Sequence, residues 1–335
     1  MPLRPWGSLA ALGLVLCLPA CAAAAVPPRG VAVQTTGRVL IEPSAGAAPY
    51  LAAVRGARRS VLVEAYLVTD PGLVQALRAA ASRGARVRVI VAGNPYRDAS
   101  AVPEERREFL GSRVQLRLAP REFEAAYVFD HAKYLVVDAG TAQGLGIVGS
   151  SNLDESGLGG EDRDDDYETG SHAVVRALAA VFDADWAGEA LQAGAAGPLV
   201  LSPGSEPPIA ALLDSARRSI DIETEEFGDV PGVMAALESA LARKVAVRIV
   251  VPSDISAADM RQIETLERLG ARAVRLGTPY PHCKLIVVDA SVAFLGSENF
   301  STSSLDRNRE VGVEVGGSAV PTLESQFAAD FAHGR

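Results

Sequence analysis

Two short segments of the chain carry the same reactive side chains in the same order. Each has a histidine, a lysine two positions later and an aspartate five positions after that: His131, Lys133 and Asp138 in the first copy, and His282, Lys284 and Asp289 in the second. A glycine-serine-x-asparagine sequence follows each, with side chains Ser150 and Asn152, and Ser297 and Asn299. The chain contains only four histidines and three lysines, so this repeated pattern holds half of the histidines and two of the lysines.

Strand geometry sorts these side chains into two groups. The apolar runs after each lysine predict strands, on which side chains two positions apart point the same way. His131 and Lys133 therefore share a face, as do His282 and Lys284, and each Ser/Asn pair repeats the arrangement on a neighbouring strand. The two aspartates lie at odd offsets from the histidines and face away. We interpret both aspartates as structural, bonding turn or backbone groups.

Two His/Lys pairs with amides and hydroxyls beside them suit transfer of a phosphodiester. Lysines and neutral donors stabilise the charge on the non-bridging oxygens, so we expect neither a metal nor a cofactor. One imidazole can attack phosphorus while the other protonates the leaving oxygen. A carboxylate behind the attacking ring would fix its tautomer. Glu168 in the first copy and Glu310 in the second are the candidates for that carboxylate.

The elements around these residues also occur twice. Residues 37–66 and 197–227 both run from a short apolar strand through a turn and a helix to Ala-Arg-Arg-Ser and a second strand. A helix and another strand follow in each copy. Strands alternating with helices predict an α/β fold with two lobes, each a mixed sheet flanked by helices, at residues 33–190 and 197–335. Glu64 and Glu223 occupy equivalent strand positions, where they either line the site or pair with arginines.

The duplicated H-x-K-x4-D and G-S-x-N motifs resemble those of the phospholipase D superfamily, across essentially the whole chain after its leader. The resemblance implies a pseudo-twofold bilobal monomer with His131 and His282 at the lobe interface. It also implies metal-independent transfer through a phosphohistidine, with Ser, Asn and the distal Glu completing each half-site. Related two-motif phospholipases favour His131 as the nucleophile and His282 as the acid. The tighter spacing of copy two and its Glu310 would instead suit His282 as the nucleophile, so the sequence leaves both assignments open. Copy one departs from the compact spacing, since Asn152 to Glu168 is five residues longer than Asn299 to Glu310.

The first 21 residues are predicted to be an export signal. A positive residue, a short apolar run and Leu-Pro-Ala-Cys21 resemble a lipobox, which would make Cys21 a lipidated first residue. Simple secretion is the alternative. We therefore expect an exported protein, anchored in the cell envelope or secreted. With Cys21 acylated, Cys283 is left alone and no disulfide can form.

Export, the anchor and a net charge of −9 favour phospholipid at a membrane surface over nucleic acid as the substrate. The alternatives are an exported nuclease of the same superfamily and a non-catalytic lipid-binding module. The acidic run from Glu161 to Asp166 lacks EF-hand spacing, and we read it as a solvated loop with calcium binding as the alternative. Neither the head group nor the choice between water and alcohol as acceptor follows from the sequence.

Overall fold

The computed structural model describes residues 31–98 and 100–335. The predicted leader, residues 1–21, and its Cys21 lie outside the described residues. Among the residues that are described, no helix combines the length and the apolar character needed to cross a bilayer.

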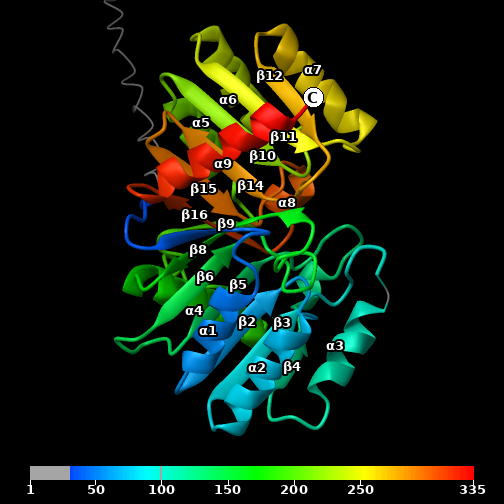
Figure 1. The fold of residues 1–335 in the computed structure, drawn as a ribbon, viewed down its shortest axis with the longest axis vertical. Helices are drawn as coiled ribbons and strands as arrows, with labels where there is room; N and C mark the ends of the chain where they lie inside the picture. Colours follow the sequence, from blue (N-terminus) through cyan, green and yellow to red (C-terminus); the bar gives the residue numbers. More distant parts are fainter. Residues whose placement is uncertain (1–30, 99) are drawn as a thin grey trace, which may run out of the picture.

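The first lobe occupies the lower half of Figure 1 and alternates strands with helices, as predicted. Its elements are β1 (Arg38–Ile41), α1 (Ala48–Gly56), β2 (Ser60–Ala65), α2 (Pro71–Ser82), β3 (Arg86–Val91), α3 (Ala101–Phe109), β4 (Gln115–Leu118), the 3-10 turn η1 (Arg121–Phe123), β5 (Lys133–Val137), β6 (Leu145–Gly149), β7 (Asp162–Arg163), β8 (Asp165–Thr169) and α4 (His172–Ala187). Local chemistry sets the helix starts. In α2, Pro71 occupies the first turn, and the Asp70 side chain accepts a hydrogen bond from the Leu73 N–H at 2.6 Å.

The second lobe, in the upper half of Figure 1, repeats this order. Its elements are β9 (Leu199–Ser202), α5 (Glu206–Ser215), β10 (Ser219–Thr224), α6 (Pro231–Ala242), β11 (Ala246–Pro252), α7 (Ala257–Arg268), β12 (Arg272–Leu276), β13 (Tyr280–Pro281), β14 (Lys284–Val288), β15 (Val292–Gly296), α8 (Thr302–Asp306), β16 (Glu310–Val315) and α9 (Ala319–His333).

The two large sheets have equivalent topologies, which confirms the predicted duplicated α/β fold. The first sheet has the order β1-β8-β6-β5-β2-β3-β4 and the second β9-β16-β15-β14-β10-β11-β12. In both, the last three strands are parallel to one another and the other neighbours are antiparallel. Each histidine therefore precedes an equivalent strand, β5 or β14, in the middle of its sheet.

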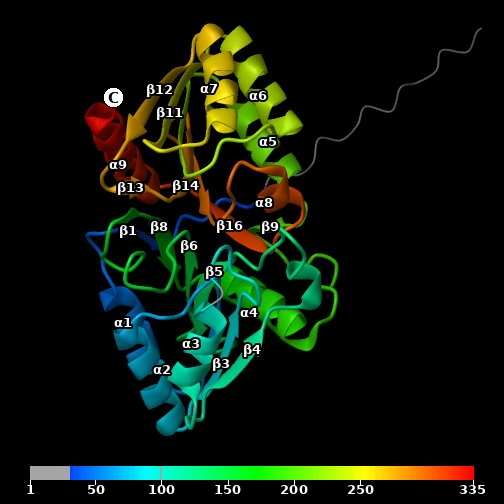
Figure 2. The same cartoon turned by 90° about the vertical axis from the view of Figure 1, so that its right-hand side faces the viewer.

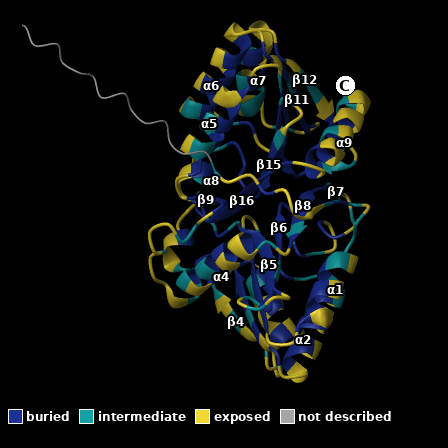
Figure 3. Ribbon diagram, turned by 90° about the vertical axis from the view of Figure 1, so that its left-hand side faces the viewer, coloured by how far each residue is buried: buried dark blue, intermediate teal, exposed yellow. Residues whose placement is uncertain are grey.

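Helices cover both faces of each sheet, so the strands carry nearly continuous apolar runs (Figures 2 and 3). In lobe one, α1 and α2 cover one face and α4 the other. In lobe two, α5 and α6 cover one face and α9 the other. The core under α4 and α9 is one cluster that runs through both lobes, with Phe182 and Phe327 fully buried in it. This shared core fixes the lobes against each other and thereby positions the groups at their interface.

Candidate active site

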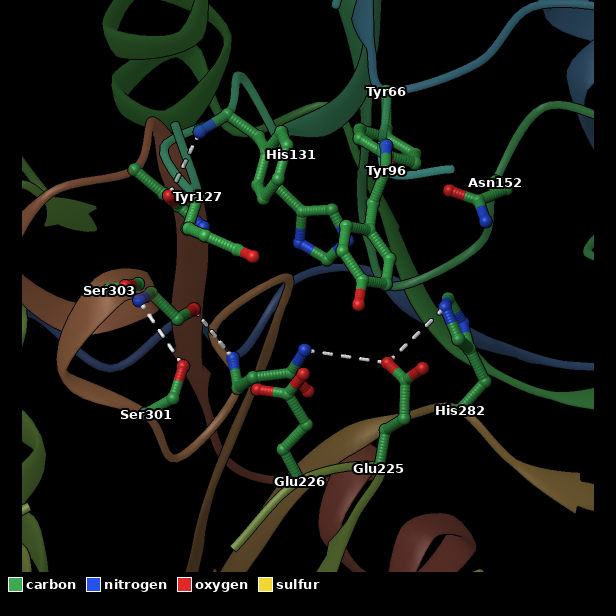
Figure 4. A pocket seen from close by; sticks show the side chains of 14 residues that line it. Tyr66, Tyr96, Tyr127, His131, Asn152, Glu225, Glu226, His282, Ser301 and Ser303 are labelled. Carbon is green, nitrogen blue, oxygen red and sulfur yellow. Dashed lines mark hydrogen bonds and ion pairs between the residues drawn. The ribbon is translucent and has the colours of Figure 1, made fainter. Parts of the chain in front are cut away.

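The histidines of the two repeated motifs meet at the lobe interface. His131 and His282 line the same cavity of about 500 Å³, to which both lobes contribute side chains (Figure 4). His131 lies two residues before Lys133, the first residue of β5, and His282 two residues before Lys284, the first of β14. The equivalent strands thus deliver both rings to one place.

Each lysine stands beside its own histidine, as strand parity predicts. The Nζ of Lys133 donates to the main-chain carbonyl of His131 at 2.9 Å, and that of Lys284 donates to the carbonyl of His282. Both lysines are 1% exposed. These two ammonium groups therefore lie next to the histidines with little water around them.

A carboxylate from the opposite lobe orients each ring. Nδ1 of His131 lies 3.0 Å from Glu310 Oε2 of lobe two, and Nδ1 of His282 lies 2.8 Å from Asp164 Oδ1 of lobe one. With Nδ1 engaged in each ring, Nε2 is the nitrogen left for chemistry. Each half-site is therefore completed by the other lobe, and neither lobe contains a complete one.

The structure corrects the expected role of Glu168. This residue lies on β8 at the protein surface, where it forms a hydrogen-bonded ion pair with Arg38 at 2.8 Å. Asp164, four residues earlier, takes the position at His282 instead. The spacing from Asn152 to Asp164 is twelve residues, against eleven from Asn299 to Glu310, so the apparent insertion before the acid in copy one largely disappears.

A sequence signal for Asp164 exists. An arginine precedes the orienting carboxylate in both copies, as Arg163-Asp164 and Arg309-Glu310. The main-chain carbonyls of the two arginines do equivalent work, because Arg309 accepts from the His131 N–H at 2.9 Å and Arg163 from the His282 N–H at 3.1 Å. Alignment on the arginine identifies the correct acid.

The side chains of these arginines tie the lobes together. Arg163 pairs with Asp330 on α9 at 2.8 Å, and Arg309 pairs with Asp185 on α4 at 2.8 Å. Every partner is at most 9% exposed. Two equivalent buried ion pairs thus hold the segments that carry Asp164 and Glu310.

The asparagines and serines separate in the structure. Asn152 and Asn299 line the cavity. Ser150 and Ser297 do not, since both are fully buried, and their Oγ atoms accept main-chain N–H bonds at 3.0 Å from Asp165 and Val311. The expectation that these serines face the substrate is therefore wrong. They attach the strand before each asparagine to β8 or β16.

The aspartates and the inner glutamates serve the scaffold. Asp138 accepts N–H bonds from Arg58, Arg59 and Ser60. Asp289 accepts the equivalent bonds from Arg217, Arg218 and Ser219. Glu64 and Glu223 are buried away from the cavity, and burial raises the pKa of both well above the usual range. Glu64 accepts a hydrogen bond from the Tyr134 hydroxyl.

Sequence reasoning missed Glu225, a carboxylate inside the cavity. Its Oε2 lies 3.0 Å from Lys284 Nζ, 3.4 Å from Asn299 Nδ2 and 3.6 Å from His282 Nε2. The equivalent residue of copy one is Tyr66, whose ring packs edge-on to His131 with the centroids 4.9 Å apart. Since Tyr66 and Glu225 differ in chemistry, comparison of the copies gave no signal at this position.

The surroundings push the two histidines in opposite directions. Burial lowers the pKa of His131 below its ordinary value, and the neighbouring Glu310 only partly opposes this. Burial also acts to lower the pKa of His282, but Asp164 and Glu225 outweigh it, so the pKa is raised. The first ring is therefore the one that loses its proton more readily, and the second is the one that keeps its proton to higher pH.

The lysines differ in the same sense. Burial lowers the pKa of Lys133 to about 8. Burial opposes the charge of Lys284 as well, but its ion pair with Glu225 raises the pKa above the ordinary value. Glu225 itself is held well below its usual pKa range, because Lys284 and His282 outweigh the effect of burial.

The acidic run of copy one is not the solvated loop expected from its composition. Asp164, Asp165 and Asp166 are at most 1% exposed, and Asp166 accepts from the Ser151 hydroxyl at 2.6 Å. Ligand atoms of Asp162, Asp164 and His282 lie within 4.8 Å of one another. Two of those three side chains already bond each other, and Asp166 points elsewhere. The carboxylates of residues 161–166 therefore do not all face one point, as the calcium site considered from the sequence would require.

Comparison with known proteins agrees with this duplicated site. The family model described as "Cardiolipin synthase, PLD-like domain" matches residues 50–186 and 209–333. The chain belongs to this family of the phospholipase D superfamily. Its two matched segments carry the two histidine motifs and most of the two sheets.

Similar curated proteins are cardiolipin synthases. One from Halalkalibacterium halodurans is 27% identical over 237 residues, covering 61% of this chain and 46% of that protein. Cardiolipin synthase A of Pseudomonas putida is 26% identical over 318 residues, covering 84% of this chain and 63% of that protein. The chain thus spans about half to two thirds of the length of these relatives.

Solved structures share the fold. Phosphatidylserine synthase of Haemophilus influenzae has a TM-score of 0.66 at 12% identity, covering 91% of this chain and 88% of that one. Polyphosphate kinase of Porphyromonas gingivalis has a TM-score of 0.65 at 16% identity, covering 88% of this chain and 50% of that one. Both likenesses concern the bilobal architecture.

Proposed function

We propose that this protein cleaves or transfers the phosphodiester of a phospholipid through a phosphohistidine intermediate. One observation carries the proposal. Two histidines from equivalent strands line one cavity, each with its Nδ1 on a carboxylate of the opposite lobe. This arrangement leaves two Nε2 atoms for a single phosphate, one to attack phosphorus and one to protonate the leaving oxygen.

The electrostatics support a division of labour between the rings. A nucleophile must be neutral, and the pKa of His131 is lowered by burial. A general acid must carry its proton, and the pKa of His282 is raised by Asp164 and Glu225. In the first step the Nε2–phosphorus bond forms at His131 as the bond from phosphorus to the leaving oxygen breaks. That oxygen takes the proton of His282 Nε2.

The second step reverses the flow of the proton. Neutral His282 removes a proton from water or from an alcohol, whose oxygen attacks phosphorus and releases His131. Water gives a phosphatidic acid and an alcohol gives a new phosphodiester. Lys133, Lys284 and the two asparagines supply donors for the negative charge of each transition state.

A phospholipid substrate is favoured by the family and by the cardiolipin synthases that resemble the chain. The test is incubation of the purified protein with phospholipids labelled in the acyl chains, with chelator present. We expect phosphatidic acid with water alone and an additional phosphatidyl alcohol when a short alcohol is supplied. Cleavage of single-stranded DNA without phospholipid turnover would favour the nuclease alternative.

Two variants and a matched control complete this test. His131→Ala should abolish turnover of natural phospholipids, and His282→Ala should slow it about 10²–10⁴-fold. His172→Ala replaces an exposed histidine at the start of α4 and should keep wild-type activity. Activity that persists in His131→Ala would refute the proposed intermediate.

We also propose that the protein is exported and anchored through Cys21. Radiolabelled palmitate fed to expressing bacteria should be incorporated into the wild-type chain and not into Cys21→Ala. Release of an unlabelled protein into the medium would instead favour simple secretion.

A further inference from the structure

Glu225 occupies donors that a substrate phosphate needs. Lys284, Asn299 and His282 surround one carboxylate oxygen of Glu225 at 3.0, 3.4 and 3.6 Å. Figure 4 shows Glu225 beside His282 in the cavity. Among the described residues no carboxylate bonds the equivalent donors Lys133 and Asn152 of lobe one, where Tyr66 takes the place of Glu225. A phosphodiester that binds both half-sites must therefore take Lys284 from Glu225.

This exchange leaves a charge to be compensated. The side chain of Glu225 is only 26% exposed, so water replaces the lost ammonium poorly. A carboxylate left without its cation in such surroundings is unfavourable, and this cost weakens the binding of any substrate that displaces Lys284. A substrate that brings its own positive charge avoids this cost, because the phosphate binds Lys284 while the substrate cation binds Glu225.

The cavity offers two further features that suit a cation. Four aromatic rings form a row from His131 to the exposed Tyr127, with neighbouring centroids 6.2 to 6.3 Å apart: Tyr66, Phe129, Tyr96 and Tyr127. Aromatic faces attract cations, and two of these rings already do so within the chain: Lys133 Nζ lies 5.2 Å from the Tyr66 centroid and Arg97 Cζ 4.9 Å from that of Tyr96. In addition, Oδ1 of Asn299 is buried without a hydrogen-bond partner among the described residues, and it can accept from an N–H group.

We propose that Glu225 and Asn299, in a cavity also lined by Tyr66 and Tyr96, form a subsite for an ammonium group attached to the substrate phosphodiester. The inference rests on the proposed function, since it names the class of head group at the same site. It favours a zwitterionic phosphodiester, such as one bearing ethanolamine, over a phosphodiester of glycerol. The negative charge of Glu225 beside the phosphate site also disfavours the binding of polyanions.

Calorimetry with two soluble phosphodiesters tests the subsite. Glycerophosphoethanolamine carries an ammonium group and glycerophosphoglycerol carries a neutral glycerol in its place. Both are titrated into the full chain carrying His131→Asn, which prevents cleavage, with and without Glu225→Gln. We expect the ethanolamine compound to bind about tenfold more tightly when Glu225 is present, as one desolvated cation contact allows.

Glu225→Gln should act in opposite directions on the two ligands. The ethanolamine compound loses its partner and binds more weakly, whereas the glycerol compound no longer competes with a carboxylate and binds more tightly. Asp229→Asn, which removes an exposed carboxylate from the following loop, should change neither affinity.

Several results would overturn the subsite. Equal affinities for the two ligands, tighter binding of the glycerol compound, no binding of either, or a preference that survives Glu225→Gln would each do so. The proposed function is judged separately, by turnover of labelled phospholipids in the chain with His131 intact. Turnover without the ammonium preference would remove only the subsite.

Discussion

The two half-sites have the same framework and different chemistry. In each, a histidine lies just before a central strand, and a lysine is the first residue of that strand. The opposite lobe supplies a carboxylate to the Nδ1 atom of the histidine. They differ at one equivalent position inside the cavity, which is Tyr66 in copy one and Glu225 in copy two. Burial lowers the pKa values of His131 and Lys133, whereas Asp164 together with Glu225 raises that of His282, and Glu225 raises that of Lys284. The duplicated fold thus builds two equal positions, and the cavity residues assign them different work.

Substitution of the two histidines should cause the largest losses of activity and the clearest difference between the half-sites. His131→Ala should be inactive toward every substrate, because no covalent intermediate can form, with a loss on the order of 10⁶-fold. His282→Ala should lose about 10²–10⁴-fold with a phospholipid. With a phosphodiester of p-nitrophenol it should keep much of the first step, since that leaving group needs little protonation.

Burst kinetics would measure this difference directly. His282→Ala should release a burst of about one p-nitrophenolate per chain and then stall. A burst in His131→Ala with none in His282→Ala would exchange the two roles.

The crossed carboxylates should give the next largest effect. Asp164→Asn and Glu310→Gln each remove a charge from Nδ1 of a histidine, and we expect a loss of about 10–100-fold in kcat/KM from each. Glu168→Gln is the matched control and should keep wild-type kcat/KM, since the Glu168 side chain pairs with Arg38 at the surface and does not line the cavity. A large loss in Glu168→Gln with a normal Asp164→Asn would restore the assignment made from the sequence.

Buried and exposed arginine ion pairs should differ in how much they stabilise the fold. Asp330→Ala or Asp185→Ala leaves a buried arginine without its partner and should cost about 3–5 kcal/mol of unfolding free energy. Arg38→Ala removes the exposed pair with Glu168 and should cost less than about 1 kcal/mol. Denaturant unfolding measures both, and equal effects for buried and exposed pairs would contradict the interlocking role.

The smallest expected effect is a shift in the pH dependence of kcat/KM. Activity rises with pH as His131 becomes neutral, at a pKa below its ordinary value, and falls as His282 loses its proton, at a pKa above it. Loss of the Lys133 charge, at a pKa of about 8, adds to the alkaline fall. Asp164→Asn removes the main cause that raises the pKa of His282, so the alkaline limb of kcat/KM should move to lower pH. A limb that stays in place would mean that another group controls it.

The fold and the cores of both half-sites followed from the sequence because their causes are local or repeated. Strand parity placed each lysine beside its histidine, and duplication separated the reactive histidines from the others. The serines were placed wrongly, because parity gives the face of a strand and not the contact that fills it. Their hydroxyls bond the neighbouring strands.

The missed residues depend on the opposite lobe or on a difference between the copies. Asp164 was hidden in an acidic run whose composition suggested a solvated loop, although Arg163 marked it. Its partner His282 is 118 residues away. The residue equivalent to Glu225 in copy one is Tyr66, which is not a carboxylate. The duplication, which was the strongest sequence signal, therefore did not identify Glu225. The difference between the two copies at this position acquires a functional meaning only when the folded structure shows that both residues line the cavity.

The attachment site of the phosphate tests the central claim most directly. Wild-type protein is mixed with a labelled phosphodiester, quenched in alkali within the first turnover, and mapped by mass spectrometry of its peptides. The half-site comparison predicts phosphohistidine at His131. Phosphate at His282, or no phosphoenzyme while turnover proceeds, would contradict it.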